Sequence, residues 1–304
     1  MAVNTHQDGK LRIERLSGSL GAEITGIPLT AAGPAEAGRL RELLREHLVL
    51  FLPGQHLDPD QHVAFGRLFG ELESHPNLDL RSERPEFFQL HARGGQGGIA
   101  DEWHSDLSCA DEPSVLSILQ MAKCPKVGGD TLWANMYRAY ETLSPAMREF
   151  CEGLSALHDA DPHGHSERTA IHPVVRVHPE TGRKSLFVNE HFTRRIVELS
   201  HQESDALLGF LVRWATSPRF TVRYRWTAGT IAIWDNRCTQ HHVLDDFEGD
   251  RLIQRVTVMG DHPKPAAPSR WDPYIAPLSA ASRHDRQLSN HLRDRAEPRG
   301  GASR

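Results

Sequence analysis

The chain has 304 residues, of which 38% are hydrophobic and 25% charged, and this is ordinary for a globular protein with one large or two average domains. Its formal net charge of −5 offers no basic face for nucleic acid, and no apolar run approaches the roughly 20 residues that span a bilayer. Because the polar segment 1–10 also lacks the apolar core of a signal peptide, we expect no nucleic-acid partner, no membrane partner and a cytoplasmic location.

The first elements in chain order are a strand, a helix and a second strand. Apolar and polar residues alternate over 22–27, which predicts a strand and turn. Leucines at helical spacing then predict a helix from Pro34 to about His47. The apolar run 48–52 follows directly and is stopped by Pro-Gly, so it predicts a buried strand.

Three later helices have recognisable start signals. Asp58 is a suitable N-cap because a proline follows it and a glutamine closes a capping box, and Gly70 is the expected end of that helix. Ser144 and Ser200 start two more helices in the same way. Strand-like segments lie between and after these helices, at 115–121, 131–134, 174–178, 186–189, 220–226, 230–234 and 251–259.

Many short strands separated by turns predict a mainly β fold, a sandwich or barrel with helices packed outside. No internal repeat or linker interrupts the chain before residue 263, so one domain is expected over 1–263. The remaining segment, 264–304, is rich in proline and ends in many arginines, and we expect it to lack a core of its own, to be partly disordered or docked, and to be mobile over its last twenty residues. Four apolar residues in it are candidates for docking on the body or on a second subunit in a homo-oligomer: Trp271, Tyr274, Ile275 and Leu278.

Cysteine and histidine usage needs a cautious interpretation. The four cysteines form no CxxC pair, which favours reduced thiols over a disulfide frame or a zinc ribbon. Histidine is abundant, with 19 residues. Four of them crowd a polar stretch with proline and glycine, and we interpret them as solvated loop residues rather than metal ligands: His158, His163, His165 and His172.

The most informative motif is His104-Ser105-Asp106, which is answered far downstream by His241. In an extended segment the side chains at i and i+2 project the same way, so His104 and Asp106 can occupy adjacent positions on one metal. Two imidazoles and one carboxylate leave three coordination positions free, as in non-haem Fe(II) sites that activate O₂. A lone His-x-Asp is a weak signal whose alternative is a surface turn.

A strand downstream strengthens the motif. Period-two alternation places Arg251, Ile253, Arg255 and Thr257 on one face of segment 251–259. If that face is covered, two guanidinium groups need anionic partners, since a buried unpaired charge is costly. The alternative is that both arginines pair with nearby carboxylates on a solvated sheet face, the candidates being Asp245, Asp246 and Asp250.

Together these residues resemble the taurine/2,4-dichlorophenoxyacetate dioxygenase family of Fe(II)- and 2-oxoglutarate-dependent enzymes. The resemblance covers roughly 16–263 and rests mainly on four stretches, Trp103-His104-Ser105-Asp106, Gly128-Gly129-Asp130-Thr131-Leu132-Trp133, His172-Pro173-Val174-Val175 through Phe187-Val188-Asn189-Glu190, and Trp234-Asp235-Asn236-Arg237 through Thr239-Gln240-His241. It implies a double-stranded β-helix, or jelly roll, whose open mouth holds the iron.

Carried over to this sequence, the resemblance implies His104, Asp106 and His241 as iron ligands. It places Arg251 and Thr131 on the distal carboxylate of 2-oxoglutarate. Substrate-binding positions of the family fall on His75, Phe192 and Arg255, and an anionic substrate is favoured because sulfonates or carboxylates are bound there in relatives.

Several pocket positions depart from taurine dioxygenases. Leu78 and Ala160 replace two aromatic residues, while Phe192 keeps the third. The segment 159–172 is shorter than the lid of those enzymes, and Glu102 replaces a polar amide, so that it either meets a group on a larger substrate or faces solvent. A larger and more open pocket argues against taurine as the substrate.

The reaction implied by the resemblance uses Fe(II), 2-oxoglutarate and O₂ to hydroxylate a small anionic substrate, with release of succinate and CO₂. The product either fragments, if the attacked carbon bears a heteroatom, or remains a stable hydroxylated amino acid or biosynthetic intermediate. Two alternatives remain. A non-catalytic jelly-roll binding protein would predict a broken ligand set, and a Zn²⁺ hydrolase with the same ligands gives no role to Arg251 and Thr131.

Overall fold

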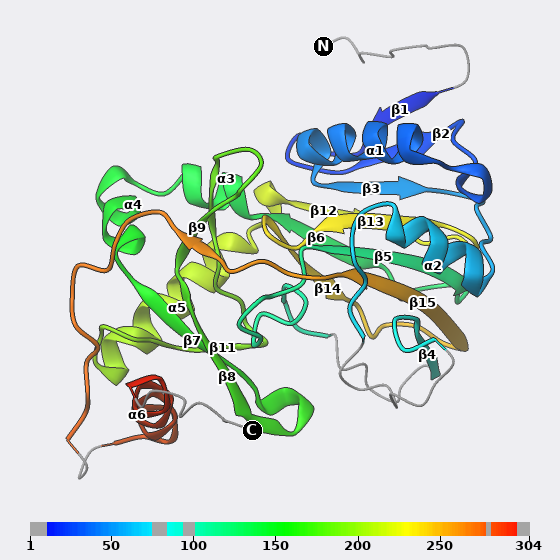
Figure 1. Cartoon of the computed structure of the whole chain (residues 1–304). Coiled ribbons are helices and arrows are strands. Elements are labelled where there is room, and N and C mark those ends of the chain that lie inside the picture. The colour runs from blue at the N-terminus through cyan, green and yellow to red at the C-terminus, as the bar shows by residue number, and fades with distance from the viewer. Residues whose placement is uncertain (1–10, 75–83, 94–100, 278–280, 297–304) are drawn as a thin grey trace, which may run out of the picture.

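The computed structural model describes residues 11–74, 84–93, 101–277 and 281–296, with side chains up to 293 (Figure 1). A mixed, β-rich body with flanking helices occupies most of this range. Within the described residues, none of the helices has the length and apolar character needed to cross a membrane. All four cysteines are unpaired, and three of them are buried.

The largest sheet has seven strands, and all its neighbours are antiparallel except β2 and β3. In spatial order the strands are β1 (Arg12–Arg15), β2 (Ala22–Thr25), β3 (Val49–Leu52), β13 (Ile231–Asp235), β5 (Leu116–Lys123), β15 (Asp250–Val258) and β4 (Phe88–Arg93). A second, three-stranded sheet consists of β12 (Thr221–Tyr224), β6 (Thr131–Asn135) and β14 (Thr239–Val243).

The central strands of the large sheet are buried on both faces, and alternation along each strand decides what each face packs against. On β13, Ile231 and Ile233 pack in the apolar cluster that includes helices α1 (Pro34–His47) and α2 (Pro59–Arg67). Ala232 and Trp234 pack on the other face, against residues of the second sheet. The two sheets therefore face each other across an aromatic-rich layer, and the helices cover the outside (Figure 1).

Two small sheets and three helices form the other half of the body (Figure 1). One sheet consists of β11 (Thr193–Ile196), β7 (Ser155–Ala160) and β8 (His165–Pro173), and the other of β10 (Lys184–Leu186), β9 (Val175–Val177) and β16 (Lys264–Pro265). The helices are α3 (Met136–Glu141), α4 (Pro145–Glu152) and α5 (His201–Ala215), and short 3-10 turns lie at Leu29–Ala31, Asp161–His163 and Pro218–Phe220.

Capping signals located the helices well, because the N-terminal contacts are local. The predicted helix 34–47 is confirmed, and Asp58 accepts from the main chain of Gln61 at 2.8 Å as a capping box requires. That helix ends at Arg67, three residues before the expected Gly70. Helices also begin directly after Ser144 and Ser200.

The interpretation of four histidines as solvated loop residues is wrong for His158 and His172. Residues 155–173 form the β7–β8 hairpin, and these two histidines inside it are almost fully buried. Burial is possible because both imidazoles find partners: His158 Nδ1 lies 3.1 Å from Ser108 Oγ, and His172 Nε2 lies 2.9 Å from the Ala110 carbonyl oxygen. A buried neutral histidine with a hydrogen bond costs little.

The expectation that the last twenty residues are mobile is wrong for 285–296, and 297–304 lie outside the described residues. Residues 283–296 form helix α6, which packs beside β8 (Figure 1). Leu288 is fully buried against Leu157 and Val197, and Asp285 pairs with the buried Arg195. Of the predicted docking residues, Trp271 contacts Phe150 while Tyr274 and Ile275 stay exposed, and Leu278 lies outside the described residues.

Candidate active site

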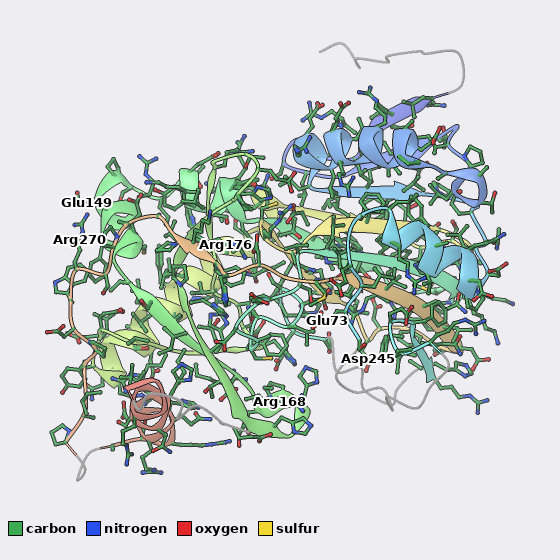
Figure 2. All side chains as sticks on the ribbon, viewed as in Figure 1. Glu73, Glu149, Arg168, Arg176, Asp245 and Arg270 are labelled. Atoms are coloured by element: carbon green, nitrogen blue, oxygen red, sulfur yellow. The ribbon has the colours of Figure 1, made fainter. Side chains whose placement is uncertain are left out.

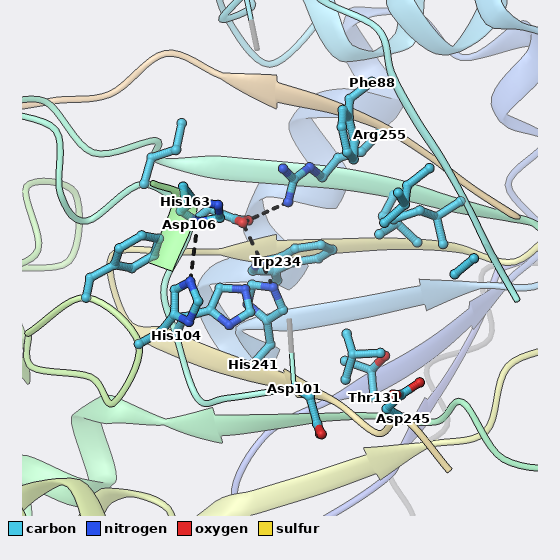
Figure 3. Close-up of a pocket in the computed structure, with 18 of the residues that line it drawn as sticks. Phe88, Asp101, His104, Asp106, Thr131, His163, Trp234, His241, Asp245 and Arg255 are labelled. Atoms are coloured by element: carbon cyan, nitrogen blue, oxygen red, sulfur yellow. Dashed lines mark hydrogen bonds and ion pairs between the residues drawn. The ribbon is translucent and has the colours of Figure 1, made fainter. Parts of the chain in front are cut away.

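His104, Asp106 and His241 converge at one point although they come from distant parts of the sequence. One potential ligand atom from each lies within 4.8 Å of the other two, and all three side chains are buried. Figure 3 shows the two imidazoles next to each other and facing the Asp106 carboxylate. The structure thus places side by side the three residues of the predicted metal site.

Main-chain hydrogen bonds hold the two histidines together. His104 N donates to His241 O at 3.0 Å, and His241 N donates to His104 O at 2.8 Å. His104 Nδ1 lies 2.7 Å from the carbonyl oxygen of Glu102. A neutral imidazole carries its proton on the nitrogen that faces a carbonyl, so Nε2 of His104 is left as a lone pair for a metal.

Asp106 begins a tight turn instead of continuing an extended strand, and the next residue, Leu107, has a positive φ of 50°. Its carboxylate is fixed from two sides. Ser117 Oγ donates to Oδ2 at 2.6 Å, and Arg255 donates to Oδ1 at 2.7 Å. The turn directs the carboxylate toward the two imidazoles, which strict alternation along a strand would not have specified.

Burial and mutual charge set the protonation states of this trio. Burial, with the neighbouring His241 charge, holds the pKa of His104 well below its ordinary range, and burial lowers the pKa of His241 to about 4. Burial alone would raise the pKa of Asp106, but Arg255 and the two histidines outweigh it and hold that pKa well below its ordinary value. At neutral pH the trio is two neutral imidazoles and one carboxylate, which is the donor set that a divalent metal requires.

A cavity of about 350 Å³ opens beside the trio, and both Arg251 and Thr131 line it. Arg251 is about 95% buried, its Nε has no hydrogen-bond partner, and no carboxylate of the described residues pairs with it. Burial lowers its pKa to about 10, so the guanidinium is still charged at neutral pH. Thr131 Oγ1 accepts from Trp226 Nε1 at 2.9 Å, which leaves its hydroxyl proton free to donate into the cavity.

Two of the three carboxylates proposed as alternative partners of these arginines pair with other cations, and the third, Asp245, lines the cavity. Asp250 pairs with Lys123 at 2.6 Å and Arg93 at 3.2 Å, and Asp246 approaches Arg223 at 3.8 Å. Arg251 and Arg255 instead point into the cavity from one face of β15, as the alternation predicted. The alternative of a solvated sheet face is therefore wrong.

The substrate end of the cavity is formed by residues that the sequence singled out and by others that it did not. Phe192 lies beside His104, with 6.4 Å between ring centroids. Ala160, the residue that stands in place of an aromatic side chain, also lines the cavity. His163 and His165, which we had interpreted as solvated, also line the cavity. His75 and Leu78 lie outside the described residues.

Glu102 is about half exposed but does not simply face solvent. Its carboxylate lies 2.8 Å from His191 Nδ1, and His191 Nε2 lies 3.3 Å from His163 Nε2. These contacts connect the segment before the His-x-Asp motif to the cavity wall. The sequence did not indicate that His191 contributes to the cavity wall, because a histidine next to an aromatic residue is common and points to no particular role.

Comparison with known proteins identifies the family. Residues 12–257 match the family model described as "Taurine catabolism dioxygenase TauD, TfdA family". The chain belongs to the TauD/TfdA family of α-ketoglutarate-dependent dioxygenases.

Individual relatives of this TauD/TfdA chain include an alkylsulfatase of Acinetobacter baylyi, 36% identical over 83% of this chain and 86% of the relative. An α-ketoglutarate-dependent sulfate ester dioxygenase of Pseudomonas putida is also 36% identical, over 84% of this chain and 91% of the relative. Among solved structures, a taurine dioxygenase from Burkholderia xenovorans is 38% identical and superposes with a TM-score of 0.76, covering 84% of this chain and 93% of that one.

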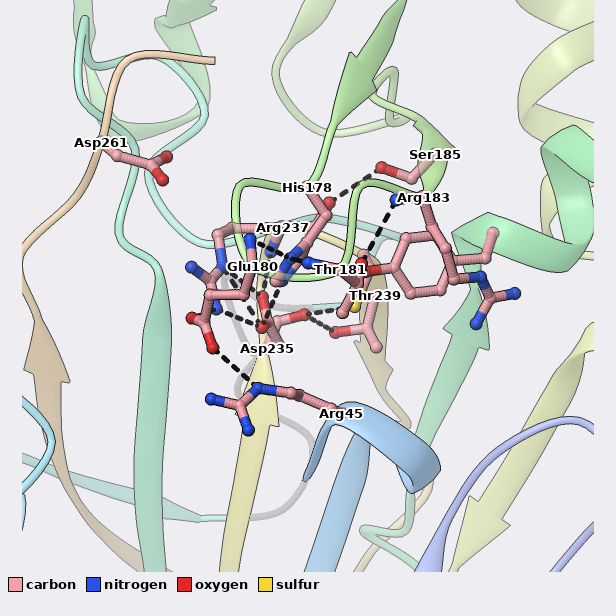
Figure 4. A network of polar contacts seen from close by, with 12 residues as sticks. Arg45, His178, Glu180, Thr181, Arg183, Ser185, Asp235, Arg237, Thr239 and Asp261 are labelled. Carbon is pink, nitrogen blue, oxygen red and sulfur yellow. Dashed lines mark hydrogen bonds and ion pairs between the residues drawn. The ribbon is translucent and has the colours of Figure 1, made fainter. Parts of the chain in front are cut away.

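A buried polar network supports the site of this TauD/TfdA chain from behind (Figure 4). Arg237 donates to both oxygens of Asp235, at 2.9 and 2.6 Å, and His178 Nε2 lies 3.0 Å from the same carboxylate. Thr239 Oγ1 donates to the Asp235 carbonyl at 2.7 Å, and Ser105 Oγ donates to the Thr239 carbonyl at 2.7 Å. The network therefore links the β13–β14 turn to the residue between the two upstream ligands.

His178, Asp235 and Cys238 also have ligand atoms within 4.8 Å of one another, but they do not suit a metal. The guanidinium of Arg237 already occupies both oxygens of Asp235 and would repel a cation. Burial also raises the pKa of the Cys238 thiol well above its ordinary value. The Trp-Asp-Asn-Arg stretch contributed to the family resemblance in the sequence, but nothing in the pattern showed what Asp235 and Arg237 contact.

Proposed function

We propose that this dioxygenase uses Fe(II), 2-oxoglutarate and O₂ to hydroxylate a small organic anion, with sulfate esters as the first candidates. The observation that supports this most directly is Arg251, a buried guanidinium without a carboxylate partner in the same cavity as His104, Asp106 and His241. A buried cation of this kind requires an anionic ligand. The two 36%-identical relatives, an alkylsulfatase and a sulfate ester dioxygenase, favour that substrate class.

The trio fits the metal because its donors are neutral imidazole and ionised carboxylate, buried and within reach of one ion. His104, Asp106 and His241 would hold Fe(II). The bound metal would supply the oxidising power, by activating O₂ at the expense of 2-oxoglutarate, which is converted to succinate and CO₂. Ser117 orients one oxygen of Asp106, and the Glu102 carbonyl fixes the tautomer of His104.

Arg251 and Thr131 would bind the distal carboxylate of 2-oxoglutarate. A guanidinium offers two parallel donors that match a carboxylate, and the Thr131 hydroxyl adds a third. The indole of Trp226 orients that hydroxyl. Because the site is buried, these bonds form without competition from water, so the cosubstrate is held in one orientation.

Arg255 would bind the anionic group of the substrate, and Phe192 would pack against its carbon chain. Arg255 now bonds Asp106 and lies over the Phe88 ring at 5.3 Å, so it sits between the metal ligands and the substrate end. If the hydroxyl is placed on the carbon that bears the sulfate oxygen, the carbon–oxygen bond breaks. The carbon then becomes an aldehyde, and sulfate leaves while the hydroxyl proton is released.

The test is a coupled assay of the purified protein with Fe(II) and 2-oxoglutarate under air. Linear alkyl sulfates, alkanesulfonates, phenoxyacetates and amino acids are compared, and succinate and the organic product are quantified. We expect succinate in step with aldehyde and sulfate for at least one alkyl sulfate. Turnover only with amino acids or biosynthetic intermediates would replace the substrate class, and no succinate with any compound, with Zn²⁺ supporting hydrolysis instead, would overturn the proposal.

Three architectural features remain proposals. We infer that the two facing sheets form a double-stranded β-helix, because β6 and β14 pair beside the site and face strands of the large sheet. We infer a domain over 1–263 with 264–304 as a C-terminal extension, and a homo-oligomer in which the exposed Trp271 and Tyr274 contact a second copy. Light scattering of the wild type and of Trp271→Ser measures the last point.

A further inference from the structure

The β7–β8 hairpin forms one wall of the cavity, and on its exposed part Arg168 follows Glu167, which pairs with His165 at 3.2 Å. Ala160, His163, His165 and Arg168 of this hairpin all line the same cavity as Arg255. Figure 2 shows Arg168 on the hairpin, well apart from the strands of the large sheet. The hairpin therefore approaches the cavity from the side opposite β15, which carries Arg251 and Arg255.

Two polar groups on this wall are without a strong partner. Among the described residues no carboxylate lies within ion-pair distance of Arg168, and His163 Nδ1 is buried without a hydrogen bond. His163 Nε2 faces His191 Nε2 at 3.3 Å, so its ring is held in place from the other side. Such groups are satisfied by a ligand with hydrogen-bond acceptors or negative charge.

The acidic groups of the cavity lie elsewhere. Asp101 and Asp245 line it, and Figure 3 shows Asp245 next to Thr131, on the side away from His163. Asp101 is paired with His242 at 2.9 Å. With 2-oxoglutarate held by Arg251 and Thr131, a second negatively charged group that extends from the iron site is disfavoured beside Asp245 and attracted to Arg168 on the hairpin.

Between the end of the cavity at Arg255 and the end at Arg168, the cavity surface is apolar. Leu107, Cys109, Ala160 and Phe192 line it, and the last three form a buried cluster of their own. A short alkyl chain fits such a surface because it loses contact with water without leaving polar groups unsatisfied. The cavity is therefore shaped for a molecule that is polar at both ends and apolar between them.

Helix α6 holds this wall in position from outside. Arg283 pairs with Asp161 at 2.5 Å, Gln287 Nε2 donates to the carboxylate of Asp159 at 3.1 Å, and His291 Nδ1 lies 2.8 Å from Thr169 Oγ1. These three contacts fall directly beside the cavity-lining residues 160, 163 and 168. A hairpin clasped on its outer side presents its inner side in one geometry, which lowers the entropy cost of binding.

We propose that the β7–β8 hairpin, clasped by α6, is a second anion subsite that binds a carboxylate at the far end of the substrate through Arg168 and His163. The preferred substrate class is then an alkyl sulfate or sulfonate whose chain ends in a carboxylate. This inference rests on the proposed function, since it takes the anionic head to lie at Arg255.

Calorimetry under anaerobic conditions tests the subsite with two probes, hexyl sulfate and the same six-carbon chain ending in a carboxylate. The metal- and 2-oxoglutarate-loaded protein is titrated with each, and the ratio of the two dissociation constants is compared among variants. An exposed ion pair is worth up to about a five-fold preference, so we expect the wild type to prefer the carboxylate-bearing probe by about that factor. A ratio near one in the wild type overturns the proposal.

Substitutions of Arg168 identify the group responsible. Arg168→Ala should bring the ratio close to one, and Arg168→Glu should invert it because the new carboxylate repels the probe. Arg213→Ala removes an arginine on the outside of α5, away from the cavity lining, and should leave the ratio as in the wild type. An unchanged ratio in Arg168→Glu overturns the assignment of this residue.

The clasp is tested by Arg283→Ala, with Arg286→Ala as the matched control. Arg286 lies on the same helix, is exposed and donates only to the Ala281 carbonyl at its own N-terminus. Arg283→Ala should reduce the ratio and speed hydrogen exchange of the hairpin amides, whereas Arg286→Ala should change neither. If hydrogen exchange of the hairpin is unchanged and the ratio of dissociation constants falls equally in both variants, the contacts between α6 and the hairpin have no role in substrate binding.

The two proposals fail in different ways. If both probes bind, and succinate forms with hexyl sulfate but without any preference for the carboxylate, only the second subsite is wrong. If no probe binds the loaded protein and no sulfate ester is oxidised, the proposed substrate class is wrong, and the subsite proposal is overturned with it.

Discussion

The two ends of the cavity are built differently. Arg251 and Thr131 extend from β15 and β6, and each of these strands is paired on both sides. The hairpin wall belongs to a three-stranded sheet in which β8 is an edge strand, and its outer support comes from polar contacts with α6. A fixed frame suits a cosubstrate that is the same in every turnover, and a wall held by a few side-chain contacts is easier to alter when the substrate changes.

The largest expected effect comes from the predicted metal ligands, which lie where the cosubstrate end and the substrate end of the cavity meet. His241→Ala removes one of three donors, and we expect Fe(II) affinity to fall by more than about 100-fold, because even outer-shell changes cost 10- to 100-fold. Anaerobic competition with a chelator measures this. His201→Ala, on the surface of α5, is the control and should bind Fe(II) like the wild type. Equal affinity in both variants would show that His241 is not a ligand.

The buried polar network around Asp235, which lies behind the cosubstrate end of the cavity, should tolerate substitution poorly. Arg237→Met removes the guanidinium from the buried carboxylate of Asp235 and leaves it only His178 and the main-chain N–H of residue 237 among its described partners, so we expect the free energy of unfolding to fall by about 3 kcal/mol. Arg183→Met removes an exposed arginine that pairs with Glu141, and it should cost about 0.5 kcal/mol. Urea unfolding of both variants gives the comparison, and similar losses would contradict the importance of the buried network.

Acid should weaken both regions through one buried histidine in each. Burial lowers the pKa of His62, under the large sheet, and of His172, in the hairpin sheet, to about 4 in each case. Because the folded state favours the neutral ring, the stabilisation is complete above pH 6.5 and is lost as the pH falls toward 4. At pH 5.5 each ring should cost about 1.4 kcal/mol relative to pH 7.5.

Substitution of each histidine measures how much of the loss of stability in acid comes from the large sheet and how much from the hairpin sheet. Urea unfolding of metal-free His62→Gln and His172→Gln at pH 7.5 and 5.5 should show the pH difference reduced by about 1.4 kcal/mol in each variant. A pH difference that neither substitution reduces would mean that other groups cause the acid sensitivity.

The smallest expected effect concerns the orientation of Thr131. Trp226→Phe keeps the aromatic packing but removes the indole donor, so the 2-oxoglutarate dissociation constant should rise about five-fold. Trp214→Phe removes a comparable indole bond, to the Ala139 carbonyl, far from the cavity lining. That variant should bind 2-oxoglutarate normally, and an equal effect in both would deny Trp226 its positioning role.

The sequence predicted the strand that carries Arg251 and Arg255 better than it predicted the hairpin wall of the cavity, for physical reasons. Alternation along 251–259 correctly placed both arginines on one face, because strand geometry depends on neighbours in the chain. The hairpin was missed because His158 and His172 are polar, and their burial depends on partners 50 and 62 residues away. Helix α6 was missed because its apolar content is low and it is held by contacts with residues distant in the sequence, among them those of Leu288 and Asp285.

Anaerobic titration of the Fe(II)-loaded protein with 2-oxoglutarate, followed by the weak visible band of the chelate, tests the central claim most directly. The band should appear in the wild type and in Arg255→Ala at similar concentrations. In Arg251→Ala the half-saturating concentration should rise by at least about 30-fold, since a buried charged pair is lost. Wild-type affinity in Arg251→Ala, or an equal loss in Arg255→Ala, would contradict the division of the cavity into a cosubstrate end and a substrate end.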